Sequence, residues 1–327
     1  MAFDGILGQE TALQTLKTAL ASGRLHHGYR FEGPDGVGKE HAAFGLAQAL
    51  LCPERPNDGC GACSTCRRVV SLSGEVPRVP QHPDVVLVER GLYPPAVLGR
   101  SSPETTGIGV EQVRRIVVSR AAYPPYEASH LVFIFRAAHE LTPNAANALL
   151  KTLEEPRRNV HFVLLTDQPR RLLDTIRSRT LPVRFGPLPD PVLAQIIARA
   201  GLQADETSLA LAGGSASRLL EACDPEQVAH REHFVAAVLA ALRAPDLGAT
   251  LQLAASQSLD RTGLTRDLRA LGQHFALAAR REAAGSPEPS LQGARRYGEV
   301  LVALDALERN CPPVLALETL VARLRRT

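Results

Sequence analysis

The pattern of apolar positions in the first half of the chain alternates between the periods of strands and helices. Short runs that are apolar on both faces are typical of buried parallel strands. The stretches between them carry apolar residues at helical spacing. Together they predict a doubly wound α/β domain. The strand-like segments are HGYRF (27–31), DVVLVE (84–89), HLVFIF (130–135) and HFVLLT (161–166), and the main helical segments are 12–23, 40–51, 111–121 and 143–156.

After residue 189 the strand-like pattern stops and helical patterns alone continue to Thr327. Short amphipathic helices come first, and longer ones follow. The pattern therefore predicts an α/β domain over 1–186, a small helical domain over 187–224 and a larger helical domain over 225–327. Gly, Pro and Ser are frequent at 90–108, which predicts a mobile loop.

Composition narrows the functional classes only a little. The chain has 327 residues, 45% of them hydrophobic and 4% aromatic, with a net charge of +3. This charge balance gives no argument for nucleic-acid binding by the protein as a whole. It leaves open the hypothesis that one face of the protein is basic. No apolar run approaches the length of about 18 residues that spans a bilayer, and the N-terminus lacks a signal-peptide pattern, which predicts a cytoplasmic protein. The arginines that could form a basic face are Arg67, Arg68, Arg114, Arg115, Arg157 and Arg158.

Four of the six cysteines lie close together in the segment CPERPNDGCGACSTC. Cys52, Cys60, Cys63 and Cys66 have the spacing C-x7-C-x2-C-x2-C. In a reducing compartment such a cluster indicates a metal site rather than disulfides. Four thiolates close a tetrahedral zinc site and leave no open position for catalysis. We therefore expect one structural zinc ion, with an iron–sulfur cluster as the minor alternative.

The segment GPDGVGKE (33–40) is almost a phosphate-binding loop. Gly33, Gly38 and Lys39 match the pattern GxxxxGK[ST], and Gly36 lies between them. The loop connects a predicted strand to a predicted helix, which is the context that phosphate binding requires. Glu40 stands where a Ser or Thr hydroxyl ligates Mg²⁺, and its charge repels phosphates. Binding of ATP or ADP therefore stays open.

The end of the strand 130–135 lacks the acids of a working ATPase. In P-loop ATPases an Asp there holds the Mg²⁺ shell, and in the AAA+ class an adjacent Glu polarises the attacking water. This chain has Arg136 and Ala137 at these positions, and neither can ligate a cation or accept a proton. We therefore expect a P-loop fold that does not hydrolyse ATP.

Several motifs together resemble bacterial clamp-loader subunits of DNA polymerase III. They are LHHGYRFEGPDGVGKE, the four-cysteine insert after the following helix, NALLKTLEEP and TIRSRT, and the resemblance covers about residues 1–225. It implies an AAA+ α/β domain with a zinc module at about 52–66. It also implies that 187–224 is a lid domain and that 225–327 is a helical collar domain through which subunits oligomerise.

Within this family, Arg136 and Ala137 resemble the delta-prime subunit, because the motor subunit keeps both acids. Ser178, Arg179 and Thr180 stand where the family has Ser-Arg-Cys. The resemblance therefore implies that Arg179, with Ser178 before it, is an arginine finger for the ATP site of a neighbouring subunit.

The resemblance also implies that this chain joins a gamma/tau-like motor and a delta subunit in a hetero-oligomeric ring. Through this complex it would act on the sliding clamp and on primer-template DNA. The chain would help to load the clamp without ATPase activity of its own. An active gamma/tau-like ATPase is the alternative, and Arg218 is similar to the motor's second sensor arginine but displaced by one position. A free-standing zinc-dependent nucleic-acid binder is a weaker hypothesis, because aromatic residues are scarce.

Overall fold

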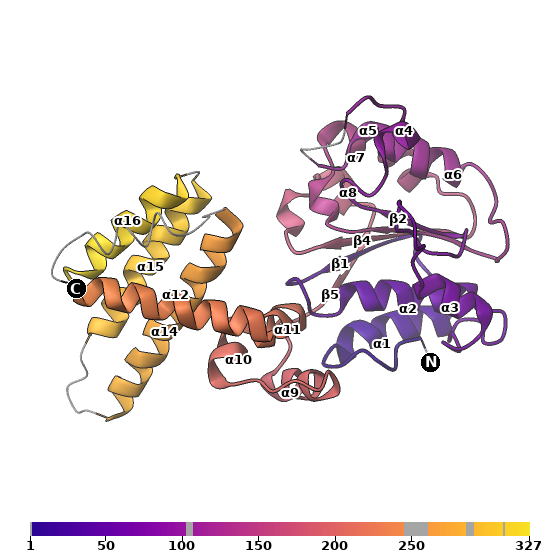
Figure 1. Ribbon diagram of the computed structural model, residues 1–327. Helices are drawn as coiled ribbons and strands as arrows, with labels where there is room; N and C mark the ends of the chain where they lie inside the picture. The colour runs from indigo at the N-terminus through magenta and orange to yellow at the C-terminus, as the bar shows by residue number, and fades with distance from the viewer. Residues whose placement is uncertain (1, 103–106, 245–260, 286–290, 310) are drawn as a thin grey trace. The chain divides into compact units, whose positions relative to one another are not determined.

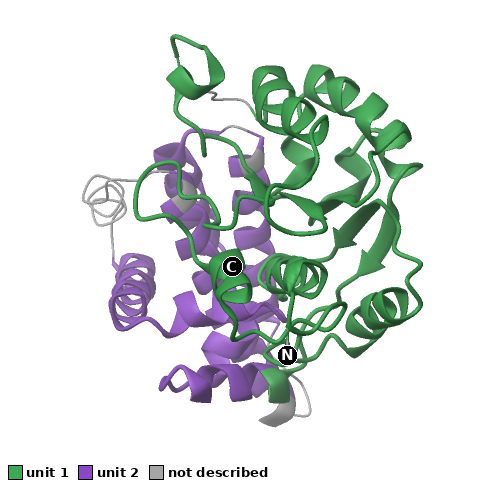
Figure 2. Ribbon diagram, turned by 90° about the vertical axis from the view of Figure 1, so that its right-hand side faces the viewer, with its two compact units in different colours: residues 1–192 green, residues 193–327 purple. Residues whose placement is uncertain are grey.

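The computed structural model (Figure 1) describes residues 2–102, 107–244, 261–285, 291–309 and 311–327. The chain forms two compact units, Met1–Val192 and Leu193–Thr327, which Figure 2 distinguishes by colour. Each unit has a hydrophobic core of its own. The division into three domains that the sequence predicts stays a prediction.

The first unit is built on a five-stranded parallel sheet with the strand order β2-β3-β4-β1-β5. β3 and β4 are buried along their whole length, as the predicted parallel strands require. A parallel sheet brings the carboxyl ends of its strands to one edge, where ligands bind in doubly wound folds. The strands are β1 Gly28–Glu32, β2 Val85–Val88, β3 Leu131–Phe135, β4 Val160–Thr166 and β5 Leu181–Arg184.

Helices cover both faces of this sheet, so the unit has three layers (Figure 1). α1, α2 and α3 lie on one face, and the helices from α4 to α8 lie on the other. α7 buries Leu149 and Leu153 in a core that includes the stacked rings of Phe133 and Phe162. The α-helices are α1 Glu10–Ala21, α2 Lys39–Leu51, α3 Ser64–Val70, α4 Pro95–Leu98, α5 Val110–Gln112, α6 Ser119–Ala121, α7 Pro143–Glu154 and α8 Asp174–Arg177, with a π-helix η1 Val113–Val118 between α5 and α6 and 3-10 helices η2 Ala138–Glu140 and η3 Pro169–Arg171.

The predicted α/β class is confirmed, and the helix ends have local causes. The Thr142 hydroxyl oxygen accepts a hydrogen bond from the Ala145 amide at 3.3 Å, and Pro143 begins α7, where it loses no helical hydrogen bond. β5 is the element that the apolar pattern missed. It is a short edge strand in which only Val183 is buried, and an edge position tolerates Pro182.

The segment predicted to be a mobile loop, 90–108, contains the short helix α4. Its residues 103–106 lie outside the described part of the chain.

The described part of the second unit is helical. Its core gathers Phe234, Leu268 and Leu317 from three different helices. Gly213 and Gly214 both have positive φ angles and separate α10 from α11. Among the described residues, no helix combines the length and the apolar character that a bilayer crossing demands. The helices are α9 Asp190–Arg199, which leads into the unit, α10 Glu206–Ala212, α11 Ala216–Cys223, α12 Pro225–Arg243, α14 Arg261–Gly285, α15 Gln292–Glu308 and α16 Pro313–Leu324.

Candidate nucleotide, metal and arginine sites

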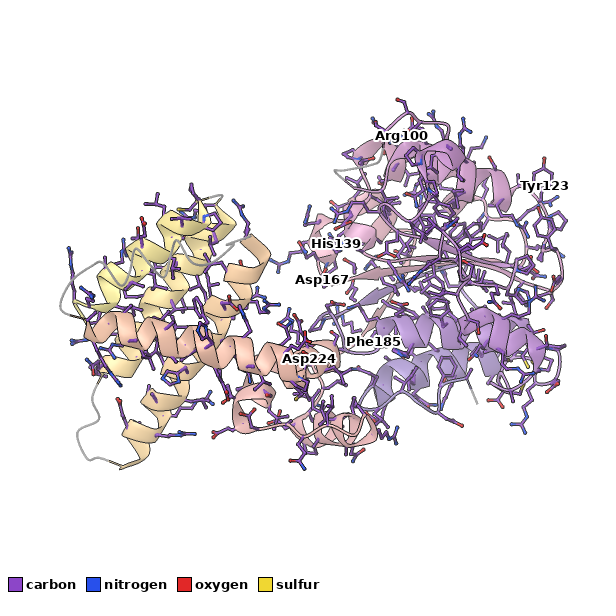
Figure 3. All side chains as sticks on the ribbon, viewed as in Figure 1. Arg100, Tyr123, His139, Asp167, Phe185 and Asp224 are labelled. Atoms are coloured by element: carbon purple, nitrogen blue, oxygen red, sulfur yellow. The ribbon has the colours of Figure 1, made fainter. Side chains whose placement is uncertain are left out.

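The segment 33–40 forms the predicted loop between β1 and α2. Gly33, Gly36 and Gly38 have φ angles of 154°, 71° and 98°, which residues with a Cβ rarely adopt. A Cβ on Gly33 would lie 2.1 Å from the carbonyl oxygen of Phe185, which is labelled in Figure 3. Position 33 therefore requires a glycine, both because the Phe185 backbone packs closely against it and because of its backbone angles.

Lys39 is folded back into its own loop. Its Nζ donates to the carbonyl oxygen of Gly33 at 2.7 Å and also to that of Pro34, and only 8% of the residue is exposed. Burial lowers the pKa of Lys39, while the carboxylates of Asp35 and Asp167 act in the opposite direction. A nucleotide phosphate would have to compete with the two carbonyl oxygens for this ammonium group.

Arg136, directly after β3, bridges two carboxylates, those of Glu40 and Glu89. Its Nη2 donates to the Glu40 carboxylate, and its Nη1 donates to Glu89 Oε2 at 2.8 Å. Burial by itself lowers the pKa of Arg136, but the hydrogen bonds to Glu40 and Glu89 outweigh burial and raise it. The guanidinium thus neutralises Glu40, the residue at the Mg²⁺-ligand position of the loop. Ala137 follows with φ 45° and offers no carboxylate.

A second polar group at the same edge of the sheet was missed in the sequence. His139 Nδ1 lies 3.2 Å from the hydroxyl of Thr166 and 3.3 Å from Asp167 Oδ1 (Figure 3). Gln168 Nε2 lies 3.5 Å from His139 Nε2. The signal that could have identified this group is the run Thr-Asp-Gln at the end of the buried strand β4, since polar side chains there lie at the ligand edge.

Arg179 lies at the opposite edge of the sheet, beside residues that precede β1. Its Nη2 is 2.5 Å from Glu154 Oε1, and its Nη1 donates to the carbonyl oxygen of Thr175 at 2.9 Å and to Ser178 Oγ at 3.2 Å. An open hollow of about 440 Å³ contains this arginine. Its lining residues are His26, His27, Leu153, Glu154, Ser178 and Arg179.

The phosphate loop and the hollow are separated by the length of β1. The loop begins at Gly33, after the strand, whereas His27 precedes it. Five residues of strand span about 16 Å. Arg179 therefore does not belong to the chain's own loop site. Arg218 lies in the second unit, on α11, where it lines a separate cavity.

The four predicted metal ligands come together at the end of α2 and the start of α3. The sulfur atoms of Cys52, Cys60, Cys63 and Cys66 all lie within 4.8 Å of one another. Cys52 and Cys63 are 3.9 Å apart, as are Cys60 and Cys66. Four sulfurs in a tetrahedron at about 2.3 Å from one ion would be about 3.8 Å apart. The cluster could therefore hold one metal ion.

Backbone amides favour the ionised form of Cys52. The Arg55 and Cys60 amides donate to its sulfur at 3.3 Å and 3.4 Å. Burial by itself raises the pKa of Cys52, but these donors outweigh burial and lower the pKa to about 7. Burial raises the pKa of Cys63 and Cys66, so the amide donors favour the thiolate that metal ligation uses at Cys52 rather than across the whole cluster.

Comparison with known families matches residues 8–189 to the family described as DNA polymerase III, delta subunit. This chain belongs to that family. The resemblance to clamp-loader subunits of DNA polymerase III that the motifs suggested is confirmed.

Two relatives illustrate the range of this clamp-loader family. The DNA polymerase III subunit gamma/tau of Mycobacterium tuberculosis (strain H37Rv) is 36% identical over 199 residues, which cover 61% of this chain and 31% of the relative. The DNA polymerase III subunit delta' of Bacillus subtilis (strain 168) is 34% identical over 180 residues, which cover 55% of this chain and 48% of the relative. The chain thus spans less than half the length of either relative.

A crystal structure of a gamma subunit-related protein from Thermotoga maritima has a similar fold. It superposes with a TM-score of 0.54 at 18% identity, over 96% of this chain and 99% of that chain. At this identity the likeness is one of fold alone.

Proposed function

We propose that this clamp-loader family member is a delta-prime-type subunit that does not hydrolyse ATP and that completes the ATP site of a neighbouring motor subunit with Arg179. The observation that carries the proposal is the ion pairing of Arg136 with Glu40 and Glu89. Mg²⁺ requires oxygen ligands, and at this site a guanidinium engages the carboxylate that could serve as one.

Hydrolysis also needs a group that positions or deprotonates the attacking water. Ala137 has no such group, and Lys39 is hydrogen-bonded to its own loop. Nucleotide could still bind, because the loop glycines keep a phosphate-binding backbone. The proposal is thus a subunit that can at most hold ATP or ADP.

Arg179 is suited to act on another molecule. It lies in an open hollow away from its own loop, and a third of its side chain, 33%, is exposed. Its Ser178 and Glu154 contacts orient a planar guanidinium that can donate to two phosphate oxygens at once. An arginine supplied in trans accelerates phosphoryl transfer by about 10³ to 10⁵.

The cysteine cluster is proposed to hold one structural zinc ion, since Cys52, Cys60, Cys63 and Cys66 fit four-coordinate geometry. A zinc ion there would supply folding energy between α2 and α3. It has no role in phosphoryl transfer in this proposal.

The proposed partners are a gamma/tau-like motor and a delta subunit in a hetero-oligomeric ring in the cytoplasm. Sliding clamp and primer-template DNA are reached through this complex. The helical second unit supplies surface for the assembly, which includes the exposed side chains of Leu301, Val302 and Leu315.

The test is Arg179→Ala in the reconstituted complex. At the one site that Arg179 serves, we expect hydrolysis to fall by about 10³ or more, while sites with other fingers continue. Arg179→Lys should restore little, because an ammonium lacks the forked donor geometry. Arg177→Ala is the control, since Arg177 is an exposed arginine two residues before Arg179, at the end of α8, and pairs with Asp174. Unchanged DNA-stimulated hydrolysis and clamp loading in Arg179→Ala would refute the finger.

The alternative, an active gamma/tau-like ATPase, draws support from one observation, the intact glycine geometry of the loop. It predicts ATP turnover by the isolated chain that Lys39→Ala abolishes. An ATP turnover no higher than background in the isolated wild-type chain would exclude this alternative.

A further inference from the structure

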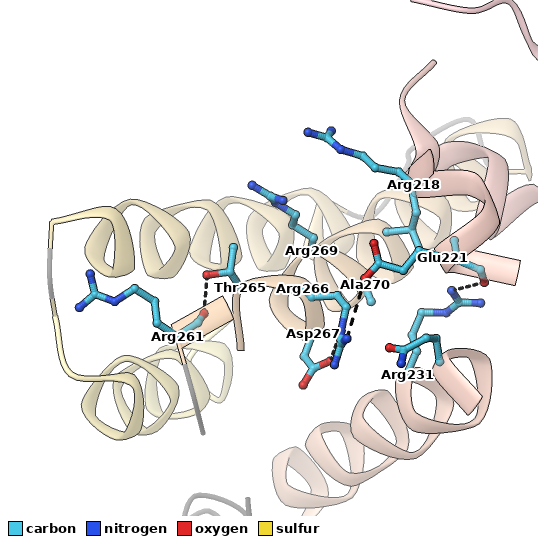
Figure 4. A pocket seen from close by; sticks show the side chains of 12 residues that line it. Arg218, Glu221, Arg231, Arg261, Thr265, Arg266, Asp267, Arg269 and Ala270 are labelled. Atoms are coloured by element: carbon cyan, nitrogen blue, oxygen red, sulfur yellow. Dashed lines mark hydrogen bonds and ion pairs between the residues drawn. The ribbon is translucent and has the colours of Figure 1, made fainter. Parts of the chain in front are cut away.

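A cavity lined by arginines lies within the second unit, between α11, α12 and α14. Its volume is about 450 Å³, within the usual range for small-ligand sites. Figure 4 shows charged side chains from all three helices around it. The arginines are Arg218 on α11, Arg231 on α12, and Arg261, Arg266 and Arg269 on α14.

Carboxylates only partly balance this positive charge. Glu221 and Asp267 also line the cavity, so five positive and two negative groups leave three positive charges. The pairs are loose, because Arg266 lies 3.9 Å from Glu221 and 3.8 Å from Asp267. Like charges gathered around one cavity repel each other, and a bound anion would relieve this repulsion.

Two of the arginines have unused donors. Within the described ranges, the side chains of Arg218 and Arg269 have no hydrogen-bond or ion-pair partner. Figure 4 shows both extending in the same direction from neighbouring helices. Both residues line the same cavity, so a ligand bound there can take donors from both.

The wall behind these arginines is held in place. The Asp267 carboxylate is 5% exposed and lies 3.1 Å from His230 Nε2, so it fixes part of α14 against α12. Arg231 Nη1 donates to the Ala222 carbonyl oxygen at 3.1 Å, which ties α12 to α11. The three helices thus form a scaffold that holds the wall of the cavity in place before a ligand arrives.

We propose that this cavity binds phosphate groups of a nucleotide or nucleic acid. Guanidinium groups are weakly hydrated and form paired hydrogen bonds to phosphate oxygens. The apolar side chains of Leu211, Ala222 and Ala270 in the same wall offer a surface for a sugar or base. This site is independent of the proposed role of Arg179.

Binding is tested on the full-length chain carrying Lys39→Ala, so that the phosphate loop contributes little. The probes are ATP without divalent cation and a short oligothymidylate, each measured by titration at low and high salt. We expect each of Arg218→Gln and Arg269→Gln to weaken binding about tenfold, and the salt dependence to decrease. Both residues are exposed, so the fold should persist.

Arg280→Gln is the control, because Arg280 is an exposed arginine of α14 outside the cavity. Tight binding of ATP assigns the site to free nucleotides, and binding of the oligonucleotide alone assigns it to a strand backbone. The proposal is overturned if neither probe binds, if Arg280→Gln weakens binding as much, or if a polyglutamate peptide binds equally well.

Discussion

The charge of Arg136 bears on the stability of the loop edge and on the proposed absence of ATP hydrolysis. Its side chain is 25% exposed and lies between Glu40 and Glu89, whose side chains are 40% and 39% exposed. Without the guanidinium, two carboxylates would face each other beside the loop. Solvent at this edge limits the repulsion, so the energy involved is modest.

Arg136→Ala should therefore lower the free energy of unfolding by about 1–2 kcal/mol at low salt and by less at high salt. It should not create ATPase activity, because Ala137 still supplies no base. Urea denaturation at two salt concentrations and a phosphate-release assay provide the measurements.

The ion pair of the exposed Arg90 with the partly exposed Glu140, at 3.4 Å, provides the control. Arg90→Ala should change stability by less than about 0.5 kcal/mol. An Arg136→Ala protein as stable as the wild type at low salt would contradict a stabilising role for the bridge.

His161, a buried residue of β4, makes stability depend on pH. Its Nε2 lies 3.0 Å from His130 Nδ1. Burial, together with the charge of His130, lowers the pKa of His161 to about 4. The unfolded chain takes up this proton near pH 6.5, so the stabilisation is complete above that pH and is lost as pH falls toward 4, by about 3 kcal/mol in total.

His161→Gln should flatten the loss of stability between about pH 6.5 and pH 4, because the residue no longer titrates. Denaturation midpoints across this range provide the measurement. His41→Gln, at an exposed position of α2, should keep the wild-type slope. Equal slopes in the His161→Gln and wild-type proteins would show that this histidine is not responsible.

At the scale of elements, the cysteine cluster connects the ends of two helices. Cys52 follows the last residue of α2, and the sulfur of Cys63 accepts a hydrogen bond from the Cys66 amide at the start of α3. Gln48 Nε2 of α2 also donates to the Cys66 carbonyl oxygen at 2.8 Å. A metal ion at this point would hold α3 to the sheet domain.

Cys60→Ser should therefore reduce bound zinc from about one ion per chain toward none. It should speed hydrogen exchange in residues 52–70 while leaving the central strands protected. Metal analysis and exchange mass spectrometry provide the two measurements. Cys311→Ser, a solitary cysteine in the second unit, should leave both unchanged. A zinc-free wild-type protein with equally protected residues 52–70 would rule out a structural ion.

At the scale of the whole molecule, the two units have separate hydrophobic cores. The core around Phe133 belongs to the first unit and the core around Phe234 to the second. Because neither core uses residues of the other unit, removal of the long C-terminal helices should leave the sheet folded.

A chain that ends at residue 224 should therefore unfold cooperatively, yet fail to join the motor-type and delta-type subunits. Circular dichroism tests the folding, and co-purification with the partner subunits tests the assembly. Full-affinity assembly of the shortened chain would remove the proposed role of the C-terminal helices.

Local patterns in the chain specify the α/β alternation, the glycine loop, the cysteine spacing and the lack of acids at Arg136 and Ala137. Each depends on neighbouring residues, because strand and helix periods, turn glycines and ligand spacing are short-range features. The pattern failed at β5, where an exposed edge strand with Pro182 buries only Val183 and so has little apolar signal.

The side-chain partners at the sites required the tertiary structure. Arg136 is 96 residues from Glu40 and 47 residues from Glu89. These residues follow β3, β1 and β2, whose carboxyl ends the parallel sheet brings to one edge. The same edge joins His139 to Thr166, while the other edge sets Arg179 against Glu154. Such pairs depend on strand order, which separates or joins residues irrespective of their distance along the chain. Composition and motif spacing do not determine the strand order, because that order follows from how the helices pack on the two faces of the sheet.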